Sequence, residues 1–206
     1  MLPKRIILIG ASVVFGRVDP EHGGFAGRLK KWHEKKFTPN AVFNLGISSE
    51  TSTMLLKRLR PEANVRKPDL IIISVGLNDV KTEKSPKNSL QTPLDKFSQN
   101  IKKIIRQSKK ICDVIFISIT PIDEKKTTPL TYQKNSYLFL EDVKKYADIT
   151  KNICIKERIP HLDVMSKWLS INYKNLLFKD GIHPNSLGHE DIFHKLKKFL
   201  ENHYTG

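Results

Sequence analysis

The sequence Asp69-Leu70-Ile71-Ile72-Ile73-Ser74-Val75 contains the strongest strand signal in the chain, and Gly76 ends it. A short, continuous run of β-branched apolar residues is typical of a strand buried on both faces, as in a parallel sheet. Four more strands are predicted from similar apolar runs, at residues 5–9, 41–45, 114–119 and 160–164. The sequence therefore predicts a five-stranded parallel sheet.

Segments with apolar residues at helical spacing separate these strands. They lie at residues 24–37, 50–59, 94–110, 136–158 and 186–202. Ser49 is the predicted N-cap of the second helix, and Pro61 is expected to end it. Strands that alternate with helices imply a parallel sheet between two helical layers. The chain has 206 residues, of which 39% are hydrophobic. We therefore predict a single three-layer α/β/α domain over residues 1–206.

The ends of three predicted strands carry small residues with hydrogen-bonding groups. In open parallel sheets, ligands bind beyond the carboxyl ends of the strands. Ser12 follows the first strand and offers a hydroxyl, Gly46 follows the second and offers a backbone N–H, and Asn78 follows the third and offers an amide. Each residue taken alone is better explained by an ordinary turn. Their coincidence at one sheet edge predicts a polar site there.

A second feature, Asp180-Gly181-Ile182-His183-Pro184, lies near the C-terminal end of the chain. A carboxylate three residues before an imidazole can hydrogen-bond the ring, which sets its tautomer and stabilises the imidazolium. Acyl transfer needs a nucleophile, a base, a group that orients the base, and donors for the developing oxyanion. Ser12, His183 and Asp180 supply the first three roles. The N–H groups of Ser12 and Gly46 and the Asn78 amide are the candidate oxyanion hole.

These stretches resemble, in order and spacing, the four sequence blocks of the SGNH hydrolases, also called the GDSL esterase/lipase family. The matching residues are Gly10-Ala11-Ser12, Gly46, Gly76-Leu77-Asn78-Asp79 and Asp180-Gly181-Ile182-His183. The resemblance implies a flavodoxin-like fold and hydrolysis of small-molecule esters or thioesters without a metal or cofactor. It also implies that Ser12 is the nucleophile, His183 the base and Asp180 its orienting carboxylate. We expect Asp79 to play a structural part by hydrogen-bonding the backbone around the site.

One position departs from the family pattern, which has an aspartate where this chain has Ala11. The missing carboxylate would help to hold the turn that carries the nucleophile and its neighbours, so we expect an active enzyme that is weakened by a less rigid oxyanion hole. The alternative function is a binding module, in which a catalytically weakened hydrolase fold recognises an anionic polymer or a membrane surface. Turnover of an ester by Ser12 would distinguish the enzyme from the module.

The formal net charge of +15 comes from many dispersed lysines, such as the pairs Lys30-Lys31 and Lys144-Lys145. Because these pairs fall on the polar faces of predicted helices, we interpret the charge as a solvated surface rather than a nucleic-acid site. It still favours an anionic substrate. His189 and His194 are spaced one residue too widely for a zinc-binding helix of the His-Glu-x-x-His type, and we expect them on the helix surface.

Cys112 and Cys154 lie in apolar segments, which predicts two buried thiols in a reducing compartment rather than a disulfide framework. The first residues are interpreted as a buried strand and not as a signal peptide, and no apolar stretch of the sequence has transmembrane length. We therefore expect a cytoplasmic protein without integral membrane association; the sequence does not determine its oligomeric state. Two long irregular segments, residues 81–93 and 123–135, are predicted binding loops or lids.

Overall fold

Five parallel strands form a central sheet with the order β2-β1-β3-β5-β7. The computed structural model describes residues 1–36, 39, 41–83 and 90–204. The strands are β1 (Arg5–Gly10), β2 (Ala41–Gly46), β3 (Leu70–Ser74), β5 (Asp113–Ile117) and β7 (His161–Leu162). Counted along the chain, this order is that of flavodoxin-like sheets, which confirms the predicted class. The interior strand β1 pairs with β2 on one side and with β3 on the other.

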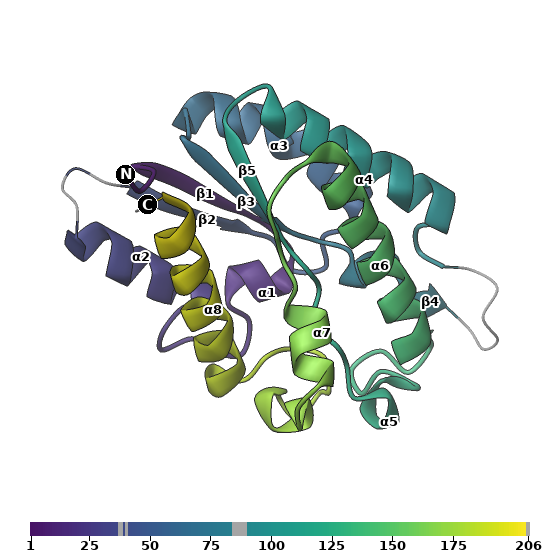
Figure 1. The fold of residues 1–206 in the computed structure, drawn as a ribbon. Helices are drawn as coiled ribbons and strands as arrows, with labels where there is room; N and C mark the ends of the chain where they lie inside the picture. The colour runs from purple at the N-terminus through teal and green to yellow at the C-terminus, as the bar shows by residue number, and fades with distance from the viewer. Residues whose placement is uncertain (37–38, 40, 84–89, 205–206) are drawn as a thin grey trace.

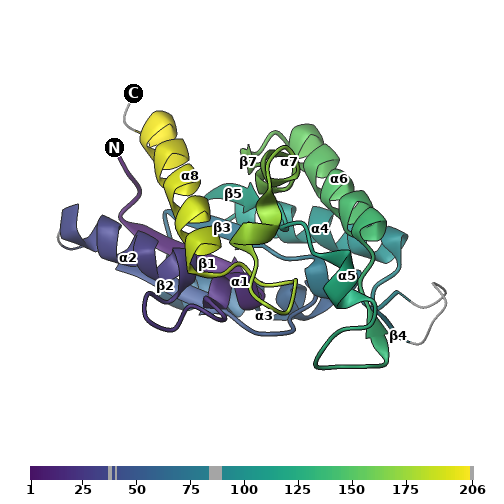
Figure 2. The same ribbon diagram turned by 90° about the horizontal axis from the view of Figure 1, so that it is seen from below.

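Helices cover both faces of the sheet (Figure 1). One layer contains α3 (Ser52–Arg66), α4 (Leu94–Lys109) and α6 (Leu140–Glu157). The other contains α2 (Gly24–Lys36), α7 (Val164–Leu169) and α8 (Ser186–Tyr204), with α2 and α8 side by side in both views (Figures 1 and 2).

The side chains of β1 show why two layers are needed. Ile7 and Ile9 belong to the core under α3, α4 and α6, whereas Ile6 and Leu8 belong to the core under α2, α7 and α8. Successive strand residues point to opposite faces, so a strand that is apolar throughout must be covered on both. The continuous apolar runs of the sequence are explained by this burial.

Short elements surround the sheet beyond the strand ends. They are α1 (Ser12–Phe15), the 3₁₀ turn η1 (Leu77–Asp79), α5 (Glu124–Thr127), the turn η2 (Tyr173–Leu176), and a small antiparallel pair of β4 (Thr82–Glu83) and β6 (Ser136–Tyr137). The β4–β6 pair joins the first segment predicted as a long loop to the residues that directly follow the second. No helix among the described residues is long and apolar enough to cross a membrane.

Two predictions about the second helix were wrong. Thr51, and not Ser49, is the N-cap of α3, and its side chain accepts a hydrogen bond from the Met54 N–H at 3.4 Å. Pro61 does not end α3, which continues to Arg66. Pro61 lies on the exposed side, where solvent can satisfy the carbonyl that a proline cannot pair. The buried stripe of Leu55, Leu59 and Ala63 continues on both sides of the proline and keeps the helix packed.

Other boundaries also differ from the sequence prediction. The long helix begins at Leu140, because Ser136 and Tyr137 pair with β4 instead. The last strand contains only His161 and Leu162, and Val164 begins α7. Phe37, the predicted end of the first helix, and residues 84–89 of the first predicted loop lie outside the described residues.

Candidate active site

The candidate site lies where the strand order of the sheet reverses, between β1 and β3. The chain leaves β1 into α1, which begins at Ser12, and leaves β3 into η1, which contains Asn78. Connections that leave neighbouring strands toward opposite faces open a crevice at the carboxyl edge of the sheet. Ser12 and Asn78 are therefore brought together by sheet topology although 66 positions separate them in the sequence.

A chain of hydrogen bonds connects Ser12, His183 and Asp180. The Ser12 Oγ lies 2.9 Å from the His183 Nε2, and the His183 Nδ1 lies 2.7 Å from the Asp180 Oδ2. An imidazole between a carboxylate and a hydroxyl can keep a proton on Nδ1 and accept the hydroxyl proton at Nε2. The three side chains come from two segments far apart in the sequence, the start of α1 and the loop before α8.

The loop that carries Asp180 and His183 is held by its own backbone. The Asp180 Oδ1 accepts hydrogen bonds from the N–H groups of Ile182 at 2.9 Å and His183 at 3.1 Å. Gly181, between Asp180 and Ile182, adopts φ +73°, a left-handed conformation that glycine adopts without strain. Burial alone would raise the pKa of the Asp180 carboxyl, but the hydrogen bonds from the His183 ring and the Ile182 N–H lower it below its usual value. The carboxylate is thus kept ionised beside the ring.

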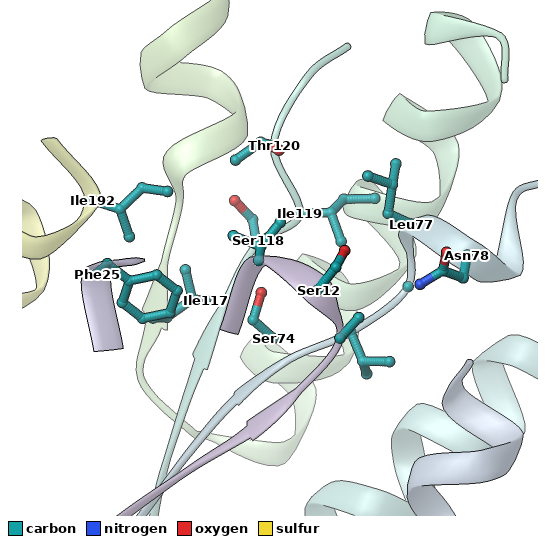
Figure 3. A pocket seen from close by; sticks show the side chains of 14 residues that line it. Ser12, Phe25, Ser74, Leu77, Asn78, Ile117, Ser118, Ile119, Thr120 and Ile192 are labelled. Atoms are coloured by element: carbon teal, nitrogen blue, oxygen red, sulfur yellow. The ribbon is translucent and has the colours of Figure 1, made fainter. Parts of the chain in front are cut away.

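Two cavities meet at Ser12. The smaller has a volume of about 20 Å³ and is mostly apolar, with Ile119, Leu77 and Ile192 in its wall (Figure 3). The larger has a volume of about 300 Å³, and polar side chains of Asn78, Lys81, Gln133 and Arg17 line it together with Ser12 and His183. Ser12 and His183 are 7% and 4% exposed, so the hydroxyl and the ring are accessible only from within this crevice.

The wall opposite His183 is formed by Asn78 and the segment that leads into α3. The Asn78 Nδ2 donates a hydrogen bond to the Glu50 carbonyl at 3.0 Å, and in Figure 3 this amide nitrogen lies on the side that faces Ser12. An amide has two N–H donors, so one remains for a ligand in the crevice. Arg58 also holds this segment, since its guanidinium pairs with the Glu50 carboxylate and donates to the Leu45 carbonyl at 2.7 Å.

Asp79 holds the Asn78 side of the crevice in place through buried hydrogen bonds to Ser52. Its carboxylate is fully buried and accepts hydrogen bonds from the Ser52 N–H at 2.9 Å and the Ser52 Oγ at 2.6 Å. Asn100 on α4 donates to the Ser52 Oγ at 3.0 Å and extends the network. Burial raises the pKa of the Asp79 carboxyl above its usual value, although the bonds from Ser52 oppose this. These contacts join η1 to the start of α3, and Ala11 takes no part in them.

Comparison with known proteins identifies the family. Residues 8–190 match the model of the GDSL-like lipase/acylhydrolase family. The chain belongs to this family. It is a carboxylic ester hydrolase, as predicted from the four sequence blocks.

Relatives and structural neighbours agree with this assignment. The chain is 26% identical over 195 residues to the GDSL esterase/lipase CPRD49 of Arabidopsis thaliana, covering 89% of this chain and 73% of the relative. It is 24% identical over 201 residues to an acetylxylan esterase of Geobacillus stearothermophilus, covering 90% and 89%. The fold is similar to that of a lipase/acylhydrolase from Enterococcus faecalis, with a TM-score of 0.79 and 20% identity over 97% of this chain and 96% of that one.

In this esterase, Gly46 lines neither of the two cavities at Ser12, unlike the other two residues of the predicted oxyanion hole, Ser12 and Asn78. Its N–H donates to the Asn44 side chain at 3.0 Å. A Cβ at this position would lie 2.1 Å from the Phe15 nitrogen, so Gly46 permits the close approach of α1 to the end of β2. The residues that line the larger cavity from this segment are Ser48 and Ser49, and Ser49 adopts φ +65°. Within the described residues, the Ser49 N–H has no hydrogen-bond acceptor.

Ser49 was predicted as a helix N-cap and not as a site residue, because a serine gives no signal of a left-handed conformation. His189 was predicted on the helix surface, and this was wrong, because the residue is fully buried. The His189 Nδ1 accepts from the Phe25 N–H at 3.2 Å, and its Nε2 lies 3.2 Å from the Arg17 carbonyl. Burial lowers the pKa of His189 to about 4, so the ring is neutral and links α8 to the α1–α2 loop.

The two cysteines are free, as expected, but only Cys154 is buried and Cys112 is partly exposed. Burial raises the pKa of each thiol to about 12, so neither is a reactive thiolate. Neither residue lines the cavities at Ser12. Among the described residues, no group of three or more histidine, cysteine or acidic side chains is arranged to hold a metal ion.

Proposed function

We propose that the protein is a serine esterase that acts through an acyl-enzyme formed on Ser12. The hydrogen-bond chain from Asp180 through His183 to Ser12, at the wall of an open crevice, is the observation that carries this proposal. A serine hydroxyl is a weak nucleophile until a base removes its proton, and the His183 Nε2 is within reach of that proton.

The reaction proceeds in two halves. In the first, the Ser12 Oγ attacks the ester carbonyl and its proton passes to the His183 Nε2, while the Asp180 carboxylate stabilises the imidazolium. The tetrahedral intermediate collapses as His183 returns the proton to the leaving alcohol or thiol, and the acyl group remains on Ser12. In the second, His183 takes a proton from water, the resulting hydroxide attacks the acyl-enzyme, and the carboxylic acid leaves as Ser12 regains its proton.

We further propose that the backbone N–H groups of Ser12 and Ser49 and the Asn78 amide bind the oxyanion. Ser12 is the first residue of α1, where N–H groups have no partner within the helix. Ser49 replaces Gly46 in this role because it lines the crevice and its N–H has no acceptor within the described residues. The hydrogen bond from Asn78 to Glu50 keeps the amide and the Ser49 segment in register.

The acyl group of the substrate is proposed to be short, such as acetyl. The apolar cavity beside Ser12 has a volume of about 20 Å³, which is room for little more than one water-sized group. Two of the similar proteins, an acetylxylan esterase among the relatives and a second among the structural neighbours, act on acetyl esters by their names. A short acyl chain would place its methyl group against Ile119 and Leu77.

Hydrolysis of p-nitrophenyl acetate tests the nucleophile. We expect wild type to release nitrophenol and Ser12→Ala to lose at least about a thousandfold in kcat. The control Ser170→Ala, at an exposed serine that directly follows α7, should keep wild-type rates. Mass spectrometry after mixing should show an acetyl adduct on wild type that is absent from Ser12→Ala. Equal rates in wild type and Ser12→Ala would refute the proposal, and absence of turnover by a folded wild type would favour the binding-module alternative.

A series of p-nitrophenyl esters of increasing chain length tests the acyl pocket. We expect kcat/KM to fall from acetate to octanoate in wild type, and Ile119→Ala to shift the preference toward longer chains because it removes part of the cavity wall. Ile104→Ala makes a matched cavity in the core under α4, away from Ser12, and should leave the preference unchanged. A wild type that prefers octanoate would contradict a short acyl group.

A further inference from the structure

Two cationic side chains line the larger cavity beside Ser12 and His183. Arg17 lies two residues after the end of α1, and Lys81 lies between η1 and β4, so the cations come from different connections at the sheet edge. The same wall contains serine, amide, tyrosine and apolar side chains and lacks a carboxylate among the described residues that line it. The cavity therefore has a net positive lining next to the reacting atoms.

Neither cation is neutralised by an ion pair among the described residues. Arg17 takes part in none of the salt bridges there, and the Lys81 Nζ donates only to the uncharged Gln133 Oε1, at 3.1 Å. The carboxylate of Asp180, which orients His183, already accepts from the His183 ring and two backbone N–H groups. Unpaired cations that face a cavity attract anions, and low-dielectric walls concentrate this field.

Lys81 is partly buried, and its amine has no salt-bridge partner among the described residues. Burial lowers the pKa of the Lys81 amine below its usual value, although the charge of Glu83 opposes this. An anion bound beside the amine would favour the ammonium form. Most other lysines of this chain lie on exposed helix faces with no such burial, for example Lys102 and Lys103 on α4. Lys81 is therefore distinguished by position and not merely by the basic composition.

We propose that Arg17 and Lys81 bind a carboxylate or phosphate group carried by the alcohol part of the substrate, so that anionic esters are preferred to neutral ones. This inference rests on the proposed serine esterase function. The small apolar cavity accepts the acyl methyl group, which leaves the larger cavity, with a volume of about 300 Å³, for the alcohol. A guanidinium and an ammonium on its wall match the oxygens of either anion.

Matched esters test the charge preference. Para-acetoxyphenylacetate carries a carboxylate on the alcohol part, and its primary amide is neutral, while the acetyl group and the phenol ring of the leaving group stay the same. We expect wild type to favour the anionic ester about tenfold in kcat/KM, mostly through KM, and the preference to shrink as salt is added. Each of Arg17→Gln and Lys81→Gln should reduce the preference about three- to fivefold, and the double variant should abolish it.

Controls separate this inference from the proposed function. Lys102→Gln removes an exposed cation of α4 and should leave both rates unchanged. If wild type hydrolyses both esters through Ser12 but without preference, or if the double variant keeps the preference, the anion site is refuted and the serine esterase stands. If Ser12→Ala hydrolyses both esters as fast as wild type, the proposed function fails and this inference fails with it. An equal fall for both esters in the variants would assign the cations to oxyanion stabilisation and also refute the anion site.

Discussion

The two sides of the Ser12 crevice are built in different ways. On one side, Asp180 and His183 stand three residues apart, and the same carboxylate that holds the ring also holds the backbone of its own loop. On the other, Asn78 and Ser49 come from separate segments that contacts through Asp79 and Glu50 bring together. A side built from one short loop can be recognised in the sequence, whereas a side assembled over long range depends on contacts that no local pattern encodes.

The difference also predicts how each side tolerates change. The loop side places its charge directly on the reacting base, so a defect there is expected to reduce turnover and leave the fold intact. The opposite wall shares its contacts with α3 and α4, so a defect there is expected to affect both turnover and stability. Mutations on the two sides can therefore show whether this division holds.

Asp180→Asn should have the largest effect. The amide keeps the shape of the side chain but cannot stabilise the imidazolium, and we expect kcat to fall by about 10⁴-fold with the melting temperature nearly unchanged. Steady-state kinetics and thermal unfolding measure the two quantities. Asp148→Asn, at an exposed position on α6, is the matched control and should behave as wild type. Full activity in Asp180→Asn would mean that His183 does not depend on this carboxylate.

Asn78→Ala should have the next largest effect, on the opposite wall. It removes a proposed oxyanion donor and the hydrogen bond to the Glu50 carbonyl, and we expect kcat to fall by about 10²- to 10³-fold with a smaller change in KM. Unlike Asp180→Asn, it should also lower the free energy of unfolding, by about 1 kcal/mol. Asn152→Ala on the exposed side of α6 is the control. A change in KM alone would place Asn78 in substrate binding instead.

Gly46→Ala tests the packing role that replaces the predicted donor role. The new Cβ would lie 2.1 Å from the Phe15 nitrogen, so α1 must move, and we expect the free energy of unfolding to fall by about 1–3 kcal/mol. Chemical denaturation measures this loss. Activity should fall with it, because α1 begins at Ser12. A stable variant with reduced kcat would instead return Gly46 to the oxyanion hole.

Ser49→Gly should have the smallest effect. It retains the backbone N–H and removes a side chain from a left-handed conformation, so we expect kcat to remain within about threefold of wild type and stability to rise by at most about 1 kcal/mol. The same assays apply, with Ser48→Gly, also in this segment, as the control that should lose stability. A large loss of kcat in Ser49→Gly would show that the hydroxyl, and not the N–H, acts in the crevice.

Much of the fold was predictable because burial dictates it residue by residue. The five apolar runs are strands and the alternating helices form two layers, since each run must be covered on both faces. The errors fall where long-range packing competes with local signals. Pro61 is tolerated because α3 is packed on both sides of it, and Ser136 joins a strand because β4 lies alongside. Where such contacts conflict with the local propensity of a residue, the contacts decide the secondary structure.

The sequence by itself determined the sheet, the family and the hydrogen-bonding partners Asp180 and His183, because periodicity and close spacing express short-range geometry directly. Only the tertiary structure decided that Gly46 faces α1, that Ser49 faces the crevice, and that Arg17 and Lys81 share a cavity with Ser12. The physical reason is that the direction of a backbone N–H or of a cationic side chain after a strand end depends on the elements that pack against that segment. For this esterase, those contacts come from helices distant in the sequence.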